Sequence, residues 1–133
     1  MDPAEPNTPT PYGLIGGDAK VRELVERFYD LMELEPDYAR LRKVHGSTLE
    51  SAREKLYQFL SGWLGGPSLY TDRHGHPMLR ARHLPFSIGN VERDQWMACM
   101  RQAMEEVDVP TDLRAALGDA FQRTADWMRN RPE

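Results

Sequence analysis

The chain has 133 residues, of which 40% are hydrophobic and 29% charged, and its formal net charge is −4. A net acidic chain of this length is expected to form one domain, and it lacks the basic surface that binds nucleic acid or anionic lipid. Cys99 is the only cysteine and no apolar run is long enough to cross a bilayer, which excludes an intramolecular disulfide and favours a cytoplasmic protein.

The chain begins with residues 1–11, which contain four prolines and little that packs, and which lack the pattern of a signal peptide. We therefore expect a flexible N-terminal tail there and a single domain over residues 12–133. From Val21 onward, apolar residues recur at helical spacing and predict a first long helix. Asp18 is its expected N-cap, and Pro36 follows its end.

Residues 35–46 are mixed and charged, and we expect a loop with at most one helical turn. Ser47 and Glu50 have the spacing of a capping box, which predicts the start of a second helix. The buried face of this helix is expected to hold Leu49, Ala52, Leu56, Phe59, Leu60 and Trp63. Gly65, Gly66 and Pro67 end it.

Residues 65–89 show no sustained period and carry seven glycines and prolines. Irregular stretches of this length are uncommon inside a domain and are usually functional. One short helix is predicted within it, because Pro77 suits a first helical position and Pro85 disfavours helix at Leu84. His83 then lies near the C-terminal end of that short helix.

The last third of the chain predicts two more long helices. Asn90 is the expected cap of the first, whose apolar stripe consists of Trp96, Met97, Met100, Met104 and Val107. Pro110 and Thr111 open the second. No stretch has the alternation of a strand, so the predicted class is all-α, with two helix pairs separated by the irregular segment.

The string HGHPMLRARHLPFSIG, residues 74–89, has the composition of a haem pocket. Neutral imidazole is a common axial ligand of haem iron, and a histidine near a helix end finds free carbonyls that orient its other ring nitrogen. His83 fits this description. Arg80 and Arg82 are candidate partners of haem propionates, because guanidinium binds carboxylates through two hydrogen bonds. Phe86 and Ile88 are apolar groups that could pack against the macrocycle.

Other interpretations of these residues remain open from spacing alone. The histidine and the arginines could be solvated surface residues, and Asp72, His74, His76 and His83 could converge on zinc. The zinc spacing matches no strong signature, and no second cysteine is available. The methionines of the third long helix could also form an adaptable surface in a haem-free interaction module.

Five segments carry a resemblance to a known family: residues 12–17 (YGLIGG), 25–32, 59–70 (FLSGWLGGPSLY), 75–89 (GHPMLRARHLPFSIG) and 92–100. In these segments the chain resembles the group II truncated haemoglobins, and the resemblance extends to about Met128. It implies a globin-like two-over-two helical sandwich around haem b, with His83 as the proximal iron ligand. It also implies that Leu56, Phe59 and Tyr70 contact the cofactor.

The same resemblance assigns the opposite, distal side of the haem. Tyr29 and Trp96 occupy the positions at which this family hydrogen-bonds the iron ligand, and a phenol or indole donor suits the partial negative charge of bound dioxygen. His45 falls where such globins place an aromatic residue or histidine. Ala52 and Leu56 are expected to face the same cavity from the second helix.

These features predict a haem protein that binds dioxygen and other diatomic ligands (NO, CO) at ferrous iron. Several polar donors would slow ligand release, which suits scavenging, sensing or redox chemistry. The alternative is a haem-dependent peroxidase or nitric oxide dioxygenase, in which His45 shuttles a proton and a separate reductase supplies electrons. We expect a monomer or a homodimer.

Overall fold

The structure, a computed structural model, describes residues 10–132. Over that range the chain forms helices and no strand. They are α1 (Pro11–Ile15), α2 (Asp18–Leu34), the 3-10 helix η1 (Pro36–Tyr38), α3 (Ala39–Val44), α4 (Glu50–Trp63), α5 (Leu69–His74), α6 (Leu79–His83), α7 (Asn90–Glu106) and α8 (Thr111–Met128). The predicted all-α class is confirmed.

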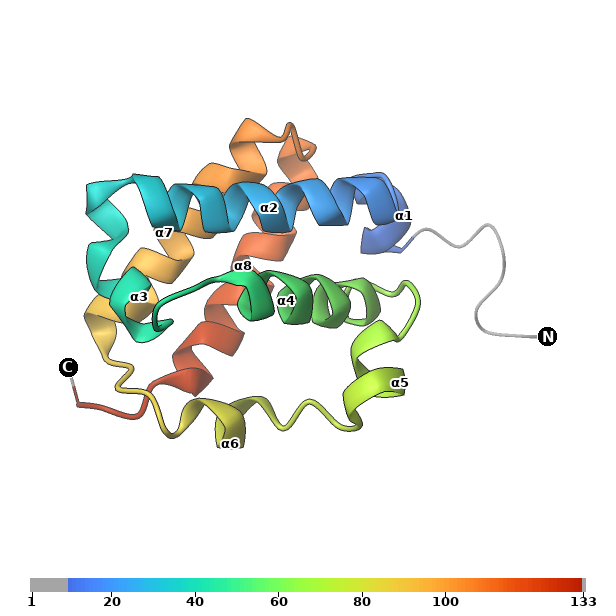
Figure 1. The fold of residues 1–133 in the computed structure, drawn as a ribbon. Helices are drawn as coiled ribbons and strands as arrows, with labels where there is room; N and C mark the ends of the chain where they lie inside the picture. Colours follow the sequence, from blue (N-terminus) through green and yellow to red (C-terminus); the bar gives the residue numbers. More distant parts are fainter. Residues whose placement is uncertain (1–9, 133) are drawn as a thin grey trace.

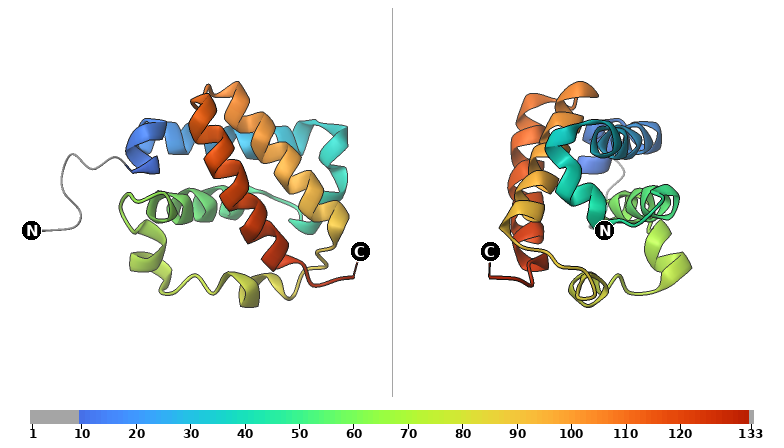
Figure 2. Two further views of the ribbon diagram at one scale, coloured as in Figure 1. Left: turned by 180° about the vertical axis from the view of Figure 1, so that it is seen from behind. Right: turned by 60° about the vertical axis from the view of Figure 1, so that its left-hand side comes forward.

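Two pairs of long helices form the body of the molecule. Helix α2 packs on α4 and on α7, and α7 packs on α8. Figure 1 shows α2 and α4 in front of α7 and α8, and Figure 2 shows the same two layers from behind and from the side. Short α6 is joined to its neighbours in the chain by extended segments, and it contacts the long helices at α8. This is the predicted two-over-two sandwich, with the irregular segment below it.

The core lies where the two layers meet. Phe28 and Leu24 of α2 and Leu60 of α4 are fully buried there. Met97, Met100 and Met104 of α7 are also buried, with at most 2% of each side chain exposed. The periodic methionines therefore belong to the core, and the alternative in which they form an adaptable exposed surface is wrong.

Three predicted helix caps differ from the structure. Helix α7 begins at the predicted cap Asn90 itself, and its N-cap is Gly89, whose backbone N–H donates to Glu92 Oε1 at 2.8 Å. Helix α2 begins at Asp18 itself, and its N-cap is Gly17 with a φ of 78°. The Asp18 carboxylate instead accepts a hydrogen bond from the Tyr57 hydroxyl. Helix α4 begins at Glu50, three residues beyond the predicted capping residue Ser47. The Ser47 carbonyl accepts a hydrogen bond from the Arg42 guanidinium at 3.2 Å, which holds this stretch as a connection.

Two regions contain more helix than the sequence predicted. The expected loop over residues 35–46 contains η1 and α3, because Leu41 is buried and its backbone N–H donates to Gln95 Oε1 of α7 at 3.0 Å. In the irregular segment, α5 precedes the predicted short helix and buries Tyr70. Helix α6 is the predicted short helix and ends at His83 as expected, but it begins at Leu79, two residues after the predicted first position Pro77, because Met78 has a left-handed backbone with a φ of 47°.

The N-terminal boundary is earlier than predicted. Thr10 caps α1, with its Oγ1 accepting from the Gly13 N–H at 3.1 Å, and Pro11 is the first residue of that helix. Both residues had been assigned to the tail, whose remainder, residues 1–9, lies outside the described residues. The ring of Tyr12 lies directly against Gly66, where a Cβ would clash with it. That contact fixes α1 to the turn after α4.

Candidate functional site

A cavity of 610 Å³ lies between α4, α6 and the α7–α8 pair. Almost every predicted site residue lines it: Tyr29, His45, Leu56, Phe59, Tyr70, Arg82, His83, Phe86, Ile88 and Trp96. Ala52 lines it too, as expected. Sites of about 300–1,000 Å³ are typical for organic ligands. The structure therefore brings together in one cavity residues from six separate parts of the sequence: α2, the end of α3, α4, α5, α6 with the segment after it, and α7.

His83 is the last residue of α6 and is half-buried at the cavity. Its Nδ1 lies 2.6 Å from the backbone carbonyl oxygen of Leu79, one turn earlier in the helix. A carbonyl only accepts, so Nδ1 carries the proton and donates. The lone pair is then on Nε2, which is the tautomer that a metal-binding histidine needs.

Two hydrogen-bond donors, one on α2 and one on α7, line the same cavity. Tyr29 of α2 is 5% exposed. Its ring and that of Trp96 of α7 both contact the ring of Phe28, with centroid distances of 4.9 Å and 5.2 Å. No residue between 10 and 132 accepts a hydrogen bond from the Tyr29 hydroxyl or the Trp96 indole. Burial raises the pKa of Tyr29 well above its usual value, which keeps the phenol protonated.

His45 caps the C-terminus of α3 and repeats the arrangement of His83. Its Nδ1 lies 2.9 Å from the Leu41 carbonyl oxygen, and its ring centroid lies 5.9 Å from that of Tyr29. Burial lowers the pKa of His45, so the ring is neutral at neutral pH. Its Nε2 is then a hydrogen-bond acceptor, which complements the two donors at the cavity.

Aromatic and aliphatic side chains form the remaining walls. Phe59 of α4 meets Tyr70 of α5 edge to face, with ring centroids 6.4 Å apart. Trp63 of α4 stacks on Phe121 of α8 at 4.7 Å, and both line the cavity. The sequence places Trp63 on the buried face of its helix but gives no sign that it belongs to the site. A largely apolar cavity lined by aromatic rings suits a planar ring system.

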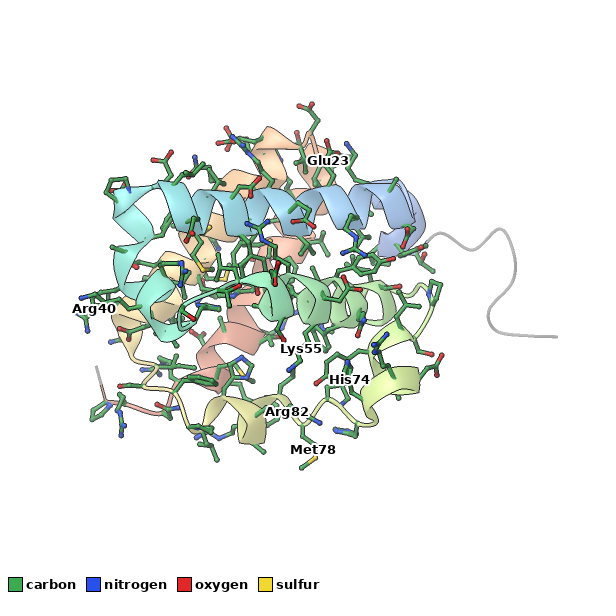
Figure 3. All side chains as sticks on the ribbon, viewed as in Figure 1. Glu23, Arg40, Lys55, His74, Met78 and Arg82 are labelled. Atoms are coloured by element: carbon green, nitrogen blue, oxygen red, sulfur yellow. The ribbon has the colours of Figure 1, made fainter. Side chains whose placement is uncertain are left out.

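The cations around the cavity differ in part from the prediction. Arg82 lines it, whereas Arg80 does not, because its guanidinium donates to the carbonyls of Trp127 and Arg129, the latter at 3.0 Å. Arg80 Nη1 is therefore bound at the end of α8 and not at the cavity. Lys55 of α4 lines it instead, and Figure 3 shows Lys55 and Arg82 in the space between α4 and α6. Lys55 follows Ala52 by three residues, which places both on the same face of the helix, and this spacing was the signal in the sequence.

The zinc alternative is wrong for the described part of the chain. His74 Nε2 pairs with Gln58 Oε1 at 3.0 Å, and His76 Nδ1 accepts from the Met78 N–H at 3.0 Å. Between residues 10 and 132 no three histidine, cysteine, aspartate or glutamate side chains converge as metal ligands would. Nor does any helix in that range have the length and hydropathy to cross a membrane.

Comparison with known proteins agrees with this geometry. Residues 10–130 match the family of bacterial-like globins. The chain is 42% identical over 123 residues to a group 2 truncated haemoglobin of Bacillus subtilis, covering 92% of this chain and 90% of that protein.

Solved structures give the same result. A group II 2-on-2 haemoglobin from Agrobacterium tumefaciens is 45% identical, with a TM-score of 0.91 and coverage of 95% of this chain and 98% of that one. For a group II truncated haemoglobin from Bacillus anthracis the values are 39%, 0.88, 96% and 95%. Membership implies oxygen binding through haem, and the chain belongs to the bacterial-like globins as a group II truncated haemoglobin.

Proposed function

We propose that this protein binds dioxygen, and likewise NO and CO, reversibly at the ferrous iron of haem b, with His83 as the iron ligand. The orientation of the His83 ring carries the proposal, because Nδ1 donates to the Leu79 carbonyl, which leaves Nε2 as the ring nitrogen that can bind iron. The donor set fits haem, with an imidazole nitrogen, flat apolar walls, and Arg82 and Lys55 for the propionates.

The haem, when bound, supplies the iron atom at which a diatomic ligand is held. The protein's own residues then set how long the ligand stays. The Tyr29 hydroxyl and the Trp96 indole N–H both have a free proton to donate, and both line a largely apolar cavity, where hydrogen bonds are stronger than in water. Slow release follows, which suits ligand scavenging, sensing or redox chemistry better than bulk oxygen delivery. A similar protein from Bacillus subtilis is described as oxygen-avid.

The test is a haem titration of the apoprotein followed by absorption spectroscopy. The wild type should develop a Soret band at one haem per chain, and His83→Ala should lose the spectrum of histidine-ligated ferrous iron. His76→Ala is the matched control, because His76 is exposed and pairs only with its local backbone. An unchanged ferrous spectrum in His83→Ala would refute the assignment.

A second candidate activity is peroxide reduction or nitric oxide dioxygenation, favoured by the tautomer of His45. Its neutral Nε2 can take a proton from a peroxide in the cavity and return it. Electrons would come from a separate reductase in the cytoplasm, where a buried single cysteine stays reduced. Turnover of the haem-loaded protein should exceed that of free haem and fall in His45→Phe. Rates equal to those of free haem would leave ligand binding alone.

A further inference from the structure

The chain that follows α8 crosses the segment that follows His83. In Figures 1 and 2 the C-terminal run lies beside the connection between α6 and α7. We call residues 83–88 the proximal segment, and residues 129–131 the C-terminal clasp. The two stretches are more than forty positions apart in sequence, yet they share a dense set of hydrogen bonds.

Asn130 makes most of these bonds. Its Nδ2 donates to the His83 carbonyl at 3.2 Å and to the Phe86 carbonyl at 2.7 Å, while its Oδ1 accepts from the Ile88 N–H at 2.9 Å. The Asn130 backbone N–H also donates to the Ile88 carbonyl at 2.8 Å. This orientation of the amide pairs each donor with an acceptor, which a flipped amide would not.

The other two residues of the clasp, Arg129 and Arg131, make further hydrogen bonds. The Arg80 guanidinium of α6 holds the Arg129 carbonyl at 3.0 Å, and Arg129 Nη1 donates to Asn90 Oδ1 at the start of α7 at 2.8 Å. Arg131 Nε donates to Ser87 Oγ at 3.0 Å. The clasp therefore ties together α6, the proximal segment and α7. It also explains why Arg80 is turned away from the cavity.

The proximal segment needs such external partners. It follows the end of a five-residue helix, and Leu84 and Phe86 are 54% and 44% exposed. The carbonyls at a helix C-terminus have no partners within the helix, and Pro85 has no N–H to offer. The His83 carbonyl accepts from the Phe86 N–H at 3.0 Å, and the Asn130 amide binds both that carbonyl and the Phe86 carbonyl, so it restrains the turn that follows His83 at both of its ends.

We propose that Asn130 is a positioning residue for the proximal histidine, so that the C-terminal clasp sets the direction of the His83 ring and the retention of haem. The inference rests on the proposed function, in which His83 binds iron. Asn130 touches only backbone atoms of the proximal segment, and it acts on the iron through the position of the peptide that bears His83.

The test compares Asn130→Ala and Asn130→Asp with wild type. The aspartate keeps the shape and the oxygen that accepts from Ile88, but it sets a carboxylate against the His83 and Phe86 carbonyls. Gln122→Ala is the matched control, because it removes an amide of α8 that pairs only with Asp126. The readouts are the rate of haem transfer to an excess of apomyoglobin and the iron–histidine stretching band in the resonance Raman spectrum of the ferrous protein.

We expect haem loss about tenfold faster in Asn130→Ala, at least as fast in Asn130→Asp, and a shifted or broadened iron–histidine band in both. The control should match wild type in both readouts. Haem loss and a band equal to those of the control would overturn the role of Asn130. If wild type itself shows no iron–histidine band, the proposed function fails instead.

Hydrogen exchange of the haem-loaded wild type covers the case in which a variant does not fold. After correction for the intrinsic exchange rate of each residue, the Ile88 amide should be about tenfold more protected than the Ser87 amide, because Asn130 Oδ1 binds only the former. Equal protection factors at Ile88 and Ser87 would also overturn the role of the clasp.

Discussion

Replacement of Tyr29 by phenylalanine removes one hydroxyl group from the distal side of the site and so tests its hydrogen bond to the iron ligand. The ring is 5% exposed and packs edge to face against Phe28, so the phenylalanine keeps the packing and removes only the hydroxyl. A hydrogen bond to a charged or strongly polarised acceptor contributes about 1.5–3 kcal/mol. Since about 1.4 kcal/mol is tenfold in rate or affinity, dioxygen should leave roughly 10 to 100 times faster.

The assay is stopped-flow displacement of dioxygen by carbon monoxide from the haem-loaded protein. Tyr38→Phe is the matched control, because Tyr38 is also buried but its hydroxyl donates to Gln102 Oε1 at 2.6 Å, away from the cavity. Burial raises the pKa of Tyr29 above its ordinary value, so the phenol keeps its proton and the wild-type rate should stay flat from pH 7 to about pH 10. A Tyr29→Phe rate no faster than that of Tyr38→Phe would refute the reasoning.

Three further outcomes follow from the fold. Met100→Ala should lower the free energy of unfolding by about 2–5 kcal/mol in urea titrations, because a fully buried side chain leaves a cavity between the layers; a loss below about 1 kcal/mol would contradict that. Gly66→Ala should lower the melting temperature, because the added Cβ displaces the Tyr12 ring; Gly118→Ala is the control, because its Cβ would make only an ordinary contact with Arg101 Nε at 3.7 Å. Burial lowers the folded-state pKa of His45, so its contribution is present above the unfolded value of about 6.5 and lost as the pH falls below it. The apoprotein should thus lose stability from pH 7.5 to pH 5.5, and His45→Gln should lose less; equal losses would show that His45 is not the cause.

The helices that the sequence predicted well are those with long apolar stripes or clear proline boundaries. Pro77 and Pro85 enclose α6, and the position of His83 at its end follows from that spacing. Helix α5 was missed because glycines and prolines surround it and it buries little beyond Tyr70. The start of α4 was misplaced because the Arg42 side chain competes for the backbone there, a tertiary contact that no local pattern contains.

The site shows the same division between local and tertiary information. His83, Tyr29 and Trp96 were assigned from motifs, and all three line the cavity. Arg80 and Arg82 are indistinguishable in sequence, yet only Arg82 lines the cavity, because the carbonyls at the end of α8 bind the other. Helical periodicity could also have identified Lys55, because it lies on the cavity-facing side of α4, but only the apolar residues of that side were considered.

Both cavity histidines take their tautomer from a main-chain carbonyl four residues earlier, at Leu79 for His83 and at Leu41 for His45. Every residue type supplies that oxygen, so substitution at either leucine leaves the orienting group in place. The tautomers of the two histidines therefore do not change when either leucine is substituted, and they depend on the helical spacing of four residues instead. An insertion or deletion in α3 or α6 would rotate an imidazole away from its carbonyl, although the chain had kept every functional side chain.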